Sequence, residues 1–282
     1  KILSVAAILI VVAASIFLSF SESWYAEGNA LAEKGSITID GENLDDEILR
    51  LSTLWEYYEG ELLTPKSFEG ESKPVPTGYI NPLGTIISDC YDKPLAISGA
   101  KTFRVFIKGL VPGRTYGISL DNVRAASAIY IDGKFAAKSG VPAVNMADYT
   151  SGKRLYFAFF TATEKPTEVL LQVANFETPF EGLSYDITIS HQQYAANKAL
   201  SLYATEISGM ALCFFLGVYY ILIFFSNKEQ KRYFFVSGQM LSLALVYYIN
   251  GIKVVNDAMY SFGYVFFLRI QSLALLSLGV FT

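Results

Sequence analysis

The stretch Ala128–Gly140, AIYIDGKFAAKSG, places two short β-type runs on either side of an Asp-Gly pair. Glycine tolerates the positive φ that a tight type I′ turn requires, so Asp132 and Gly133 predict a β-hairpin. Strand-like segments follow one another on both sides of this hairpin, separated by Pro, Gly and Asn turn signals. Together they predict an antiparallel sandwich or jelly roll.

The neighbouring segments alternate with a period of two, as half-buried strands do. In TFRVFIK (102–108) one face carries Phe103, Val105 and Ile107, and the other carries Thr102, Arg104, Phe106 and Lys108. SYDITIS (184–190) alternates in the same way, with Tyr185, Ile187 and Ile189 on one face. We expect these apolar faces to build a core. The β-domain is predicted to cover residues 35–192.

Long apolar runs lie on both sides of this domain. Residues 2–20, 207–227 and 233–252 contain no charge, and 258–282 contains only Arg269. Each run is about long enough to cross a hydrocarbon core of ~30 Å as a helix. The sequence therefore predicts helices near 204–226, 233–252 and 260–282 in a membrane region at 200–282. The chain stops inside the last run, so we expect the helical bundle to be truncated here.

The loop SNKEQKRY (226–233) carries three basic residues and one acid, which predicts a cytoplasmic position by the positive-inside rule. Residues 21–198 then lie outside the cytoplasm, and the protein is predicted to be a multi-pass protein of the cytoplasmic membrane. Residues 1–20 fit a transmembrane anchor and a cleaved signal peptide equally well. Either of the two exports the block that follows.

Composition and motifs exclude several functions for this segment. The block 21–198 holds 16 Lys and Arg against 23 Asp and Glu, a net charge of −7, which gives no footprint for nucleic acid. With a single histidine, His191, there is no multi-His metal cluster and no His-based nucleophile triad. Phosphate-binding and dinucleotide glycine motifs are absent as well. We therefore expect no metal, no cofactor and no catalytic residue here. Paired carboxylates for glycoside hydrolysis stay open, because such pairs are recognised by their separation in space and not by their spacing in sequence.

A binding function is the remaining reading of the β-domain. Jelly rolls bind sugars through aromatic faces together with a few convergent polar groups. Trp55 and Tyr57 are candidates for stacking, although such aromatics are more often core residues, and Tyr185 lies on the face predicted to be buried. Asn122 and Asn175 follow strands, where turn residues are expected. Arg104 and Arg124 are the stronger candidates, because planar guanidinium groups suit carboxylate ligands.

Two charges fall in the predicted membrane region. Glu206 lies near the outer end of one helix and Arg269 about two turns into another. A charge inside a bilayer is a functional hypothesis by default, although Arg269 is equally well placed to snorkel outward.

The segments LWEYYEGELLTP, KTFRVFIKG, ISLDNVRAASAIYIDGKFAAKSG and VLLQVANF, in this order, resemble the type 2 extracellular domain of bacterial seven-transmembrane receptors with diverse intracellular signalling modules. The motif FFLGVYYILIFFSNKEQKRYFFVSGQMLSLALVYYING resembles the first two helices and the basic loop of that family's membrane domain. The resemblance covers nearly the whole chain from Gly35. The chain departs from the pattern at Asp132, where the usual hairpin turn has Asn, and it holds only about three of the seven helices.

The resemblance implies an extracytoplasmic jelly roll similar to galactose-binding domains, followed by a helical bundle. It also implies a carbohydrate or related small-molecule ligand and a cytoplasmic output module, such as a cyclase or kinase. We therefore expect the sensory part of a transmembrane signalling receptor, and a homodimer stays open. The alternatives are a membrane-tethered carbohydrate-binding module without signalling, and a polytopic envelope enzyme or transporter component.

Overall fold

The computed structural model describes residues 31–42, 44, 48–51, 53–82, 99–120, 126–152, 156–176, 187–250, 269–270 and 272–273. The described residues form two compact units, a β-sandwich unit that extends to Ala199 and a helical unit that starts at Leu200. The anchor or signal segment predicted at 1–20 lies outside the described residues, as does most of the helix predicted at 260–282.

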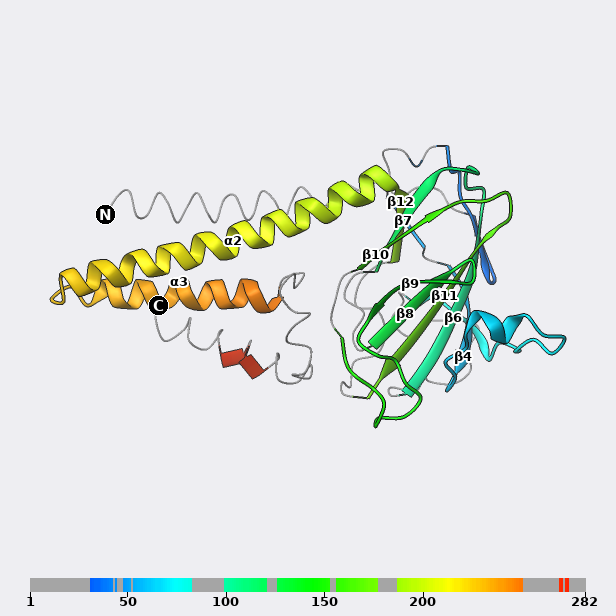
Figure 1. The fold of residues 1–282 in the computed structure, drawn as a ribbon, viewed down its shortest axis with the longest axis horizontal. Helices are drawn as coiled ribbons and strands as arrows, with labels where there is room; N and C mark the ends of the chain where they lie inside the picture. Colours follow the sequence, from blue (N-terminus) through cyan, green and yellow to red (C-terminus); the bar gives the residue numbers. More distant parts are fainter. Residues whose placement is uncertain are drawn as a thin grey trace. The chain divides into compact units, whose positions relative to one another are not determined.

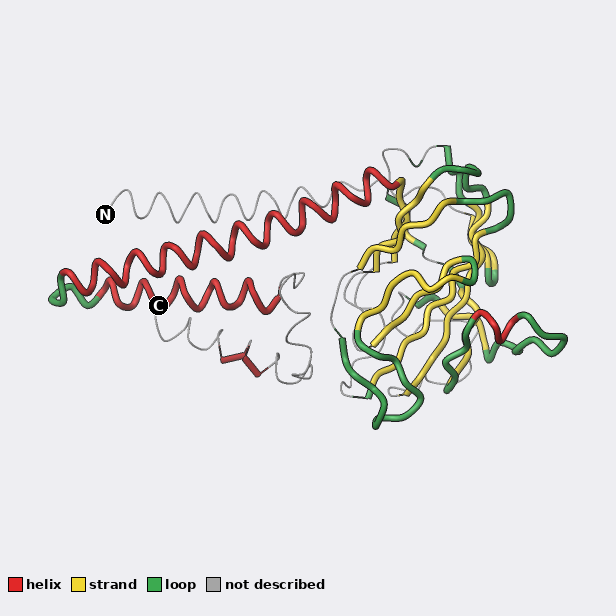
Figure 2. Tube along the Cα trace, in the orientation of Figure 1, coloured by secondary structure: helices red, strands yellow, loops and turns green. Residues whose placement is uncertain are grey.

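The larger sheet of the sandwich has eight strands, and all but one of its strand pairings are antiparallel (Figures 1 and 2). They are β1 (Leu31–Glu33), β2 (Ser36–Thr38), β4 (Trp55–Glu59), β5 (Gly78–Ile80), β6 (Gly99–Lys108), β8 (Ala126–Ile131), β9 (Lys134–Ser139) and β11 (Thr167–Asn175). The path β1-β2-β6-β11-β8-β9 crosses the sheet, and β4 pairs with β5 and β6.

The smaller sheet has four antiparallel strands in the order β10-β7-β12-β3. They are β3 (Leu49–Arg50), β7 (Thr115–Leu120), β10 (Tyr156–Thr161) and β12 (Ile187–His191). The structure is therefore a mostly antiparallel β-sandwich, as the sequence predicts at this coarse level.

The ten-residue strand β6 organises the larger sheet. Its edge pairs with β4 along the first half and with β2, in parallel, along the second half. Its other edge pairs with β11 over nine residues. One long strand with three partners thus joins chain segments that are far apart in sequence.

The core lies between the two sheets and is built from alternate residues of each strand. Phe103, Val105 and Ile107 of β6 are buried, as the alternation predicts, and so are Ile187 and Ile189 of β12. One continuous cluster contains these side chains together with those of β4, β7, β8, β10 and β11. Burial of this apolar area at roughly 25 cal/mol per Å² is the main stabilising contribution to the sandwich.

The predicted hairpin is present as β8–β9. Asp132 has φ 47° and Gly133 has φ 76°, the positive pair that a type I′ turn requires. A register shift between Ile129 and Tyr130 marks a bulge in this ladder.

The first long helix, α2 (Gln192–Ser226), begins directly after His191, the last residue of β12. Its first turn packs on the smaller sheet. Ala195 is buried, and a Cβ added to Gly117 would lie 2.6 Å from the Ala195 Cβ. Gly117 therefore makes room for the helix, which no larger residue could do without displacement.

The second helix, α3 (Arg232–Asn250), packs antiparallel against α2. Ser237 Oγ donates a hydrogen bond to the Gly217 carbonyl (2.8 Å), and Gly209 lies against the Tyr247 ring. Glycines at both contacts allow the two helices to approach closely. These bounds agree closely with the predicted helices at 204–226 and 233–252, except that α2 starts twelve residues earlier.

Within the described residues, α2 is the one helix long and apolar enough to cross a membrane. Only 11% of its most apolar stretch is buried, so its large side chains are exposed rather than packed in a core. Arg269 is exposed in a short helical segment, and Glu206 is half-buried within α2.

Candidate functional site

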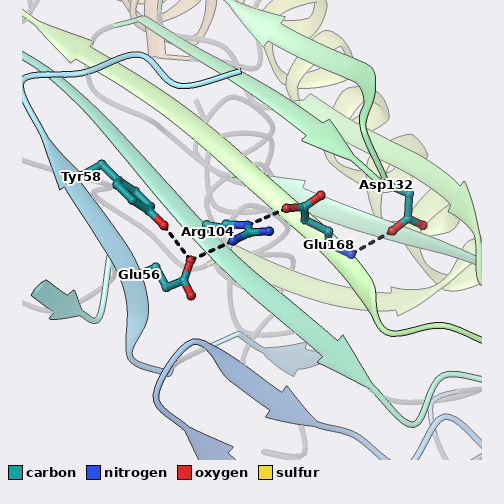
Figure 3. A network of polar contacts seen from close by, with 5 residues as sticks. All are labelled: Glu56, Tyr58, Arg104, Asp132 and Glu168. Carbon is teal, nitrogen blue, oxygen red and sulfur yellow. Dashed lines mark hydrogen bonds and ion pairs between the residues drawn. The ribbon is translucent and has the colours of Figure 1, made fainter. Parts of the chain in front are cut away.

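A polar network crosses the outer face of the larger sheet, on the side away from the core (Figure 3). At its centre, Arg104 of β6 donates from Nε to Glu168 Oε1 of β11 (2.5 Å) and from Nη1 to Glu56 Oε2 of β4 (3.3 Å). The Tyr58 hydroxyl donates to the same Glu56 oxygen (2.9 Å). The three strands are hydrogen-bonded neighbours, which places one basic and two acidic side chains side by side.

Aromatic rings enclose the same guanidinium. The Arg104 carbon Cζ lies 4.1 Å from the Phe68 ring centroid and 4.5 Å from that of Phe106. Phe106 neighbours Arg104 on the same face of β6, whereas Phe68 belongs to the short helix η1 (Pro65–Phe68) in the β4–β5 connection. The arginine therefore fastens this connection to the sheet by a cation–π contact.

Hydrogen bonds hold the same connection at a second point. The Thr102 hydroxyl donates to the Glu61 carbonyl (2.7 Å) and accepts from the Leu63 amide (2.9 Å). Gln172 of β11 donates from Nε2 to the Leu63 carbonyl (2.8 Å). The polar positions of β6 and β11 thus bind a covering segment rather than water.

Asp132 extends the network to the hairpin turn. Its Oδ1 accepts from the Glu168 amide (2.8 Å), and its own amide donates to the Glu168 carbonyl (2.9 Å). The turn is therefore tied to β11 by two hydrogen bonds beyond those of the β8–β11 ladder.

Burial changes the protonation behaviour of this network. Burial and the Glu56 carboxylate raise the pKa of Tyr58 above its usual range. Burial alone would lower the pKa of Arg104, but the hydrogen bond and charge of Glu168, with the charge of Glu56, outweigh it and raise that pKa. Burial also raises the pKa of Asp132, although the Glu168 amide opposes this. Arg104 is thus a permanent cation at neutral pH, with two anions held against it.

This geometry gives the network a structural role. Arg104 is about 15% exposed, its Nε and Nη1 bind Glu168 and Glu56, and two aromatic rings contact its guanidinium. A ligand carboxylate would compete with Glu56 and Glu168 for it. Within the described ranges, no group of three His, Cys, Asp or Glu side chains is placed to hold a metal ion.

The other sequence candidates do not gather around Arg104. Trp55 and Tyr57 are fully buried in the core, and Trp55 Nε1 donates to the Leu51 carbonyl (3.1 Å). This burial leaves neither ring accessible to a ligand, which corrects the expectation for these two residues. Asn175 is buried at the end of β11. Asn122, Arg124 and Tyr185 lie outside the described residues.

The structure adds an exposed aromatic pair that the sequence reading does not select. Phe135 of β9 is 56% exposed, and its ring meets the edge of Tyr130 on β8 at 5.7 Å between centroids. Lys138 of β9 is also exposed, and its register partner Ala128 lies two residues before Tyr130 on β8. The available signal was the apolar Phe135 directly after the Asp-Gly-Lys turn, on the outer face that Tyr130 shares.

No protein-family model matches the chain, and no curated protein matches it by sequence. The solved structures that it resembles include β-glucuronidases from Ruminococcus gnavus. One, in complex with uronic isofagomine, has 10% identity and a TM-score of 0.38, over 51% of this chain and 28% of the enzyme. A second has 11% identity and a TM-score of 0.37 over the same shares. The chain thus spans less than a third of the length of these enzymes.

Proposed function

We propose that this chain is the sensory part of a bacterial transmembrane signalling receptor. The β-sandwich is a jelly roll outside the cytoplasmic membrane that binds a carbohydrate or related small molecule. The helices α2 and α3 belong to a multi-pass bundle, which relays the binding event to a cytoplasmic output module. This segment itself catalyses no reaction in the proposal.

The observation that carries the proposal is the direct connection between sandwich and helix. No linker residue separates His191 from Gln192, and α2 continues without a break for 35 residues. Its first turn is seated on the smaller sheet through Ala195 and Gly117. A helix fixed in this way passes a displacement of the sheet along its length, whereas a flexible linker would absorb it.

Signalling then requires a ligand with different affinities for two arrangements of the protein, since only that difference shifts the population. The best-placed ligand surface among the described residues is the Phe135, Tyr130 and Lys138 part of the outer face. An exposed ring offers a surface for stacking on a sugar, and an exposed amine offers a hydrogen-bond donor and a positive charge. Tyr130 packs against the cluster that contains Phe68, the ring that Arg104 contacts.

The proposal is tested by thermal unfolding of the whole chain in detergent with neutral sugars, sugar acids, peptidoglycan fragments and amphiphiles. A ligand that binds only the folded state at about a hundred times its Kd stabilises by ~2.7 kcal/mol, a rise in Tm of roughly 5–10 °C. Phe135→Ala should remove the rise. Met146→Ala is the matched control, because Met146 is 66% exposed in the β9–β10 connection.

Coupling is tested separately by inserting three glycines between Ala199 and Leu200. With the ligand found above, hydrogen exchange in α3 should change in the unmodified chain and stay constant in the insertion variant. An α3 that responds equally in both chains contradicts the relay. A ligand that binds without any response in α3 favours a tethered binding module instead.

A further inference from the structure

The turn between α2 and α3 concentrates positive charge. We call residues 227–232 the basic turn; they contain Lys228, Lys231 and Arg232, against Glu229 as the one acid. All three basic side chains are exposed. Arg232 is also held in place, because its Nη2 donates to Gln230 Oε1 (2.6 Å) and its guanidinium lies 5.2 Å from the Tyr233 ring centroid.

A set of aromatic side chains lies within two helical turns of the basic turn. Tyr220 stacks on Tyr233 (6.1 Å between centroids, 14° between planes), and Phe224 contacts Phe234 (5.4 Å). These pairs join the last turns of α2 to the first turn of α3. Other large side chains point outward in the same region: Leu222 (60% exposed), Phe225 (62%), Phe234 (43%) and Phe235 (45%).

This surface needs a partner with two properties. The basic side chains bind an anion favourably, and the exposed aromatic rings directly beside them are stabilised by contact with hydrocarbon. A soluble acidic partner satisfies the first property and leaves the rings in water. An anionic phospholipid satisfies both, because aromatic residues favour the headgroup level of a bilayer and Lys or Arg beside them attract anionic headgroups.

We propose that the basic turn and its aromatic neighbours form a binding site for the headgroups of anionic phospholipids. Lysine ammonium and arginine guanidinium groups make charge-assisted hydrogen bonds to phosphate oxygens. The aromatic side chains lie against the acyl chains just below. The inference rests on the proposed function only in that α2 and α3 lie in a bilayer; it requires neither a ligand for the sandwich nor an output module.

The test titrates the full chain, in a neutral detergent, with phosphatidylglycerol or phosphatidylcholine of the same acyl chains. Bound lipids are counted by native mass spectrometry. We expect phosphatidylglycerol to bind about tenfold to a hundredfold more tightly, and the preference to weaken at high salt. A third arm adds glycerol phosphate as a competitor, which separates a lipid site from a site for free phosphate.

The decisive variant is K228Q/K231Q/R232Q, which should lose the preference. Its control, K66Q/K73Q/K134Q, removes three exposed lysines from the sandwich, the same change in net charge. K228Q/K231Q, which leaves Arg232 on Tyr233, replaces the triple variant if circular dichroism shows lost helix content.

Loss of the preference in the turn variant alone supports the site. Equal loss in both variants shows a net-charge effect and overturns it, as does a preference that survives in the turn variant. Displacement of the lipid by millimolar glycerol phosphate overturns the lipid assignment. If the helices are shown to be inserted and no preference exists, this inference fails while the proposed function stands.

Discussion

Asp132 occupies the left-handed region of backbone conformation at the tip of the β8–β9 hairpin, with φ 47°. Asn and Asp tolerate this region better than most residues because their short side chains bond locally. Here the carboxylate accepts from the Glu168 amide, yet burial and the Glu168 charge raise its pKa above the ordinary value of 3.8. The ionised form is therefore held at a net cost at neutral pH.

Asp132→Asn should raise stability at pH 7 by at most about 0.5 kcal/mol, or ~1–2 °C in Tm, because Asp132 is exposed and solvent screens its charge. The amide oxygen still accepts the hydrogen bond, Asn-Gly suits the turn, and no charge is partly desolvated. A raised folded-state pKa means that the aspartate's contribution falls as pH rises from 3.8 through that pKa and is then constant. The advantage of Asn should therefore be largest at pH 7 and shrink near pH 4. Thermal melts at both pH values measure the difference in stability between the Asp and Asn chains.

Asp132→Ala is the control: it loses the hydrogen bond to the Glu168 amide and should lower the stability of the sandwich. An advantage of Asn that grows on acidification would contradict the pKa argument.

Only part of the Arg104 network can be predicted from the sequence. The turn at Asp132 and Gly133 and the outward position of Arg104 follow from local pattern, since both depend on near neighbours in the chain. The partners of Arg104 do not follow from it. Glu56 and Glu168 lie 48 and 64 residues away, and their approach depends on which strands flank β6. Alternation predicts the face of the sheet on which a side chain lies but not its neighbour on the adjacent strand. The sequence pattern is therefore the same for an arginine that pairs within the sheet and for one that binds a ligand.

At the scale of elements, the contact between α2 and the smaller sheet carries the clearest prediction. A Cβ on Gly117 would lie 2.6 Å from Ala195 Cβ and 2.9 Å from a Phe159 ring carbon. Gly117→Ala should destabilise the sandwich by about 1–3 kcal/mol through overpacking and lift the first turn of α2. Ala195→Gly alone should cost about 1 kcal/mol through helix propensity.

The double variant G117A/A195G moves the methyl group from α2 to the strand and should recover part of the stability that the single variants lose. A coupling energy of about 0.5 kcal/mol or more, from unfolding of all four chains, confirms direct contact. Strictly additive effects would show that the helix does not bear on Gly117. The sequence predicts this helix only from residue 204, although no Pro or Gly interrupts residues 191–206 and the helix in fact begins at Gln192. The sequence does not predict that this helix packs on Gly117, because a glycine within a strand indicates a bulge equally well.

At the scale of the whole molecule, length and charge predict how the chain meets a membrane. A helix of 35 residues is about 52 Å long, more than the ~30 Å of a hydrocarbon core. The uncharged part of α2, residues 207–226, is about 30 Å long and thus sufficient to cross, so we expect the polar first turns, with Ala195, to stay outside with the sandwich. The acidic block 21–198 and the basic turn should then fall on opposite sides, as the positive-inside rule requires.

Cysteine labelling in intact cells of a bacterial host tests this arrangement, in a chain whose natural cysteines, Cys90 and Cys213, are replaced by alanine. Lys138→Cys and Lys228→Cys then place single thiols at exposed positions of the sandwich and of the basic turn. A membrane-impermeant maleimide should label the first variant in intact cells and the second only after permeabilisation, with the cysteine-free chain as the background. Labelling of both from the same side would show that α2 does not cross. That result would remove the physical basis for a relay, because a helix that stays on one side of the membrane carries no displacement to the other.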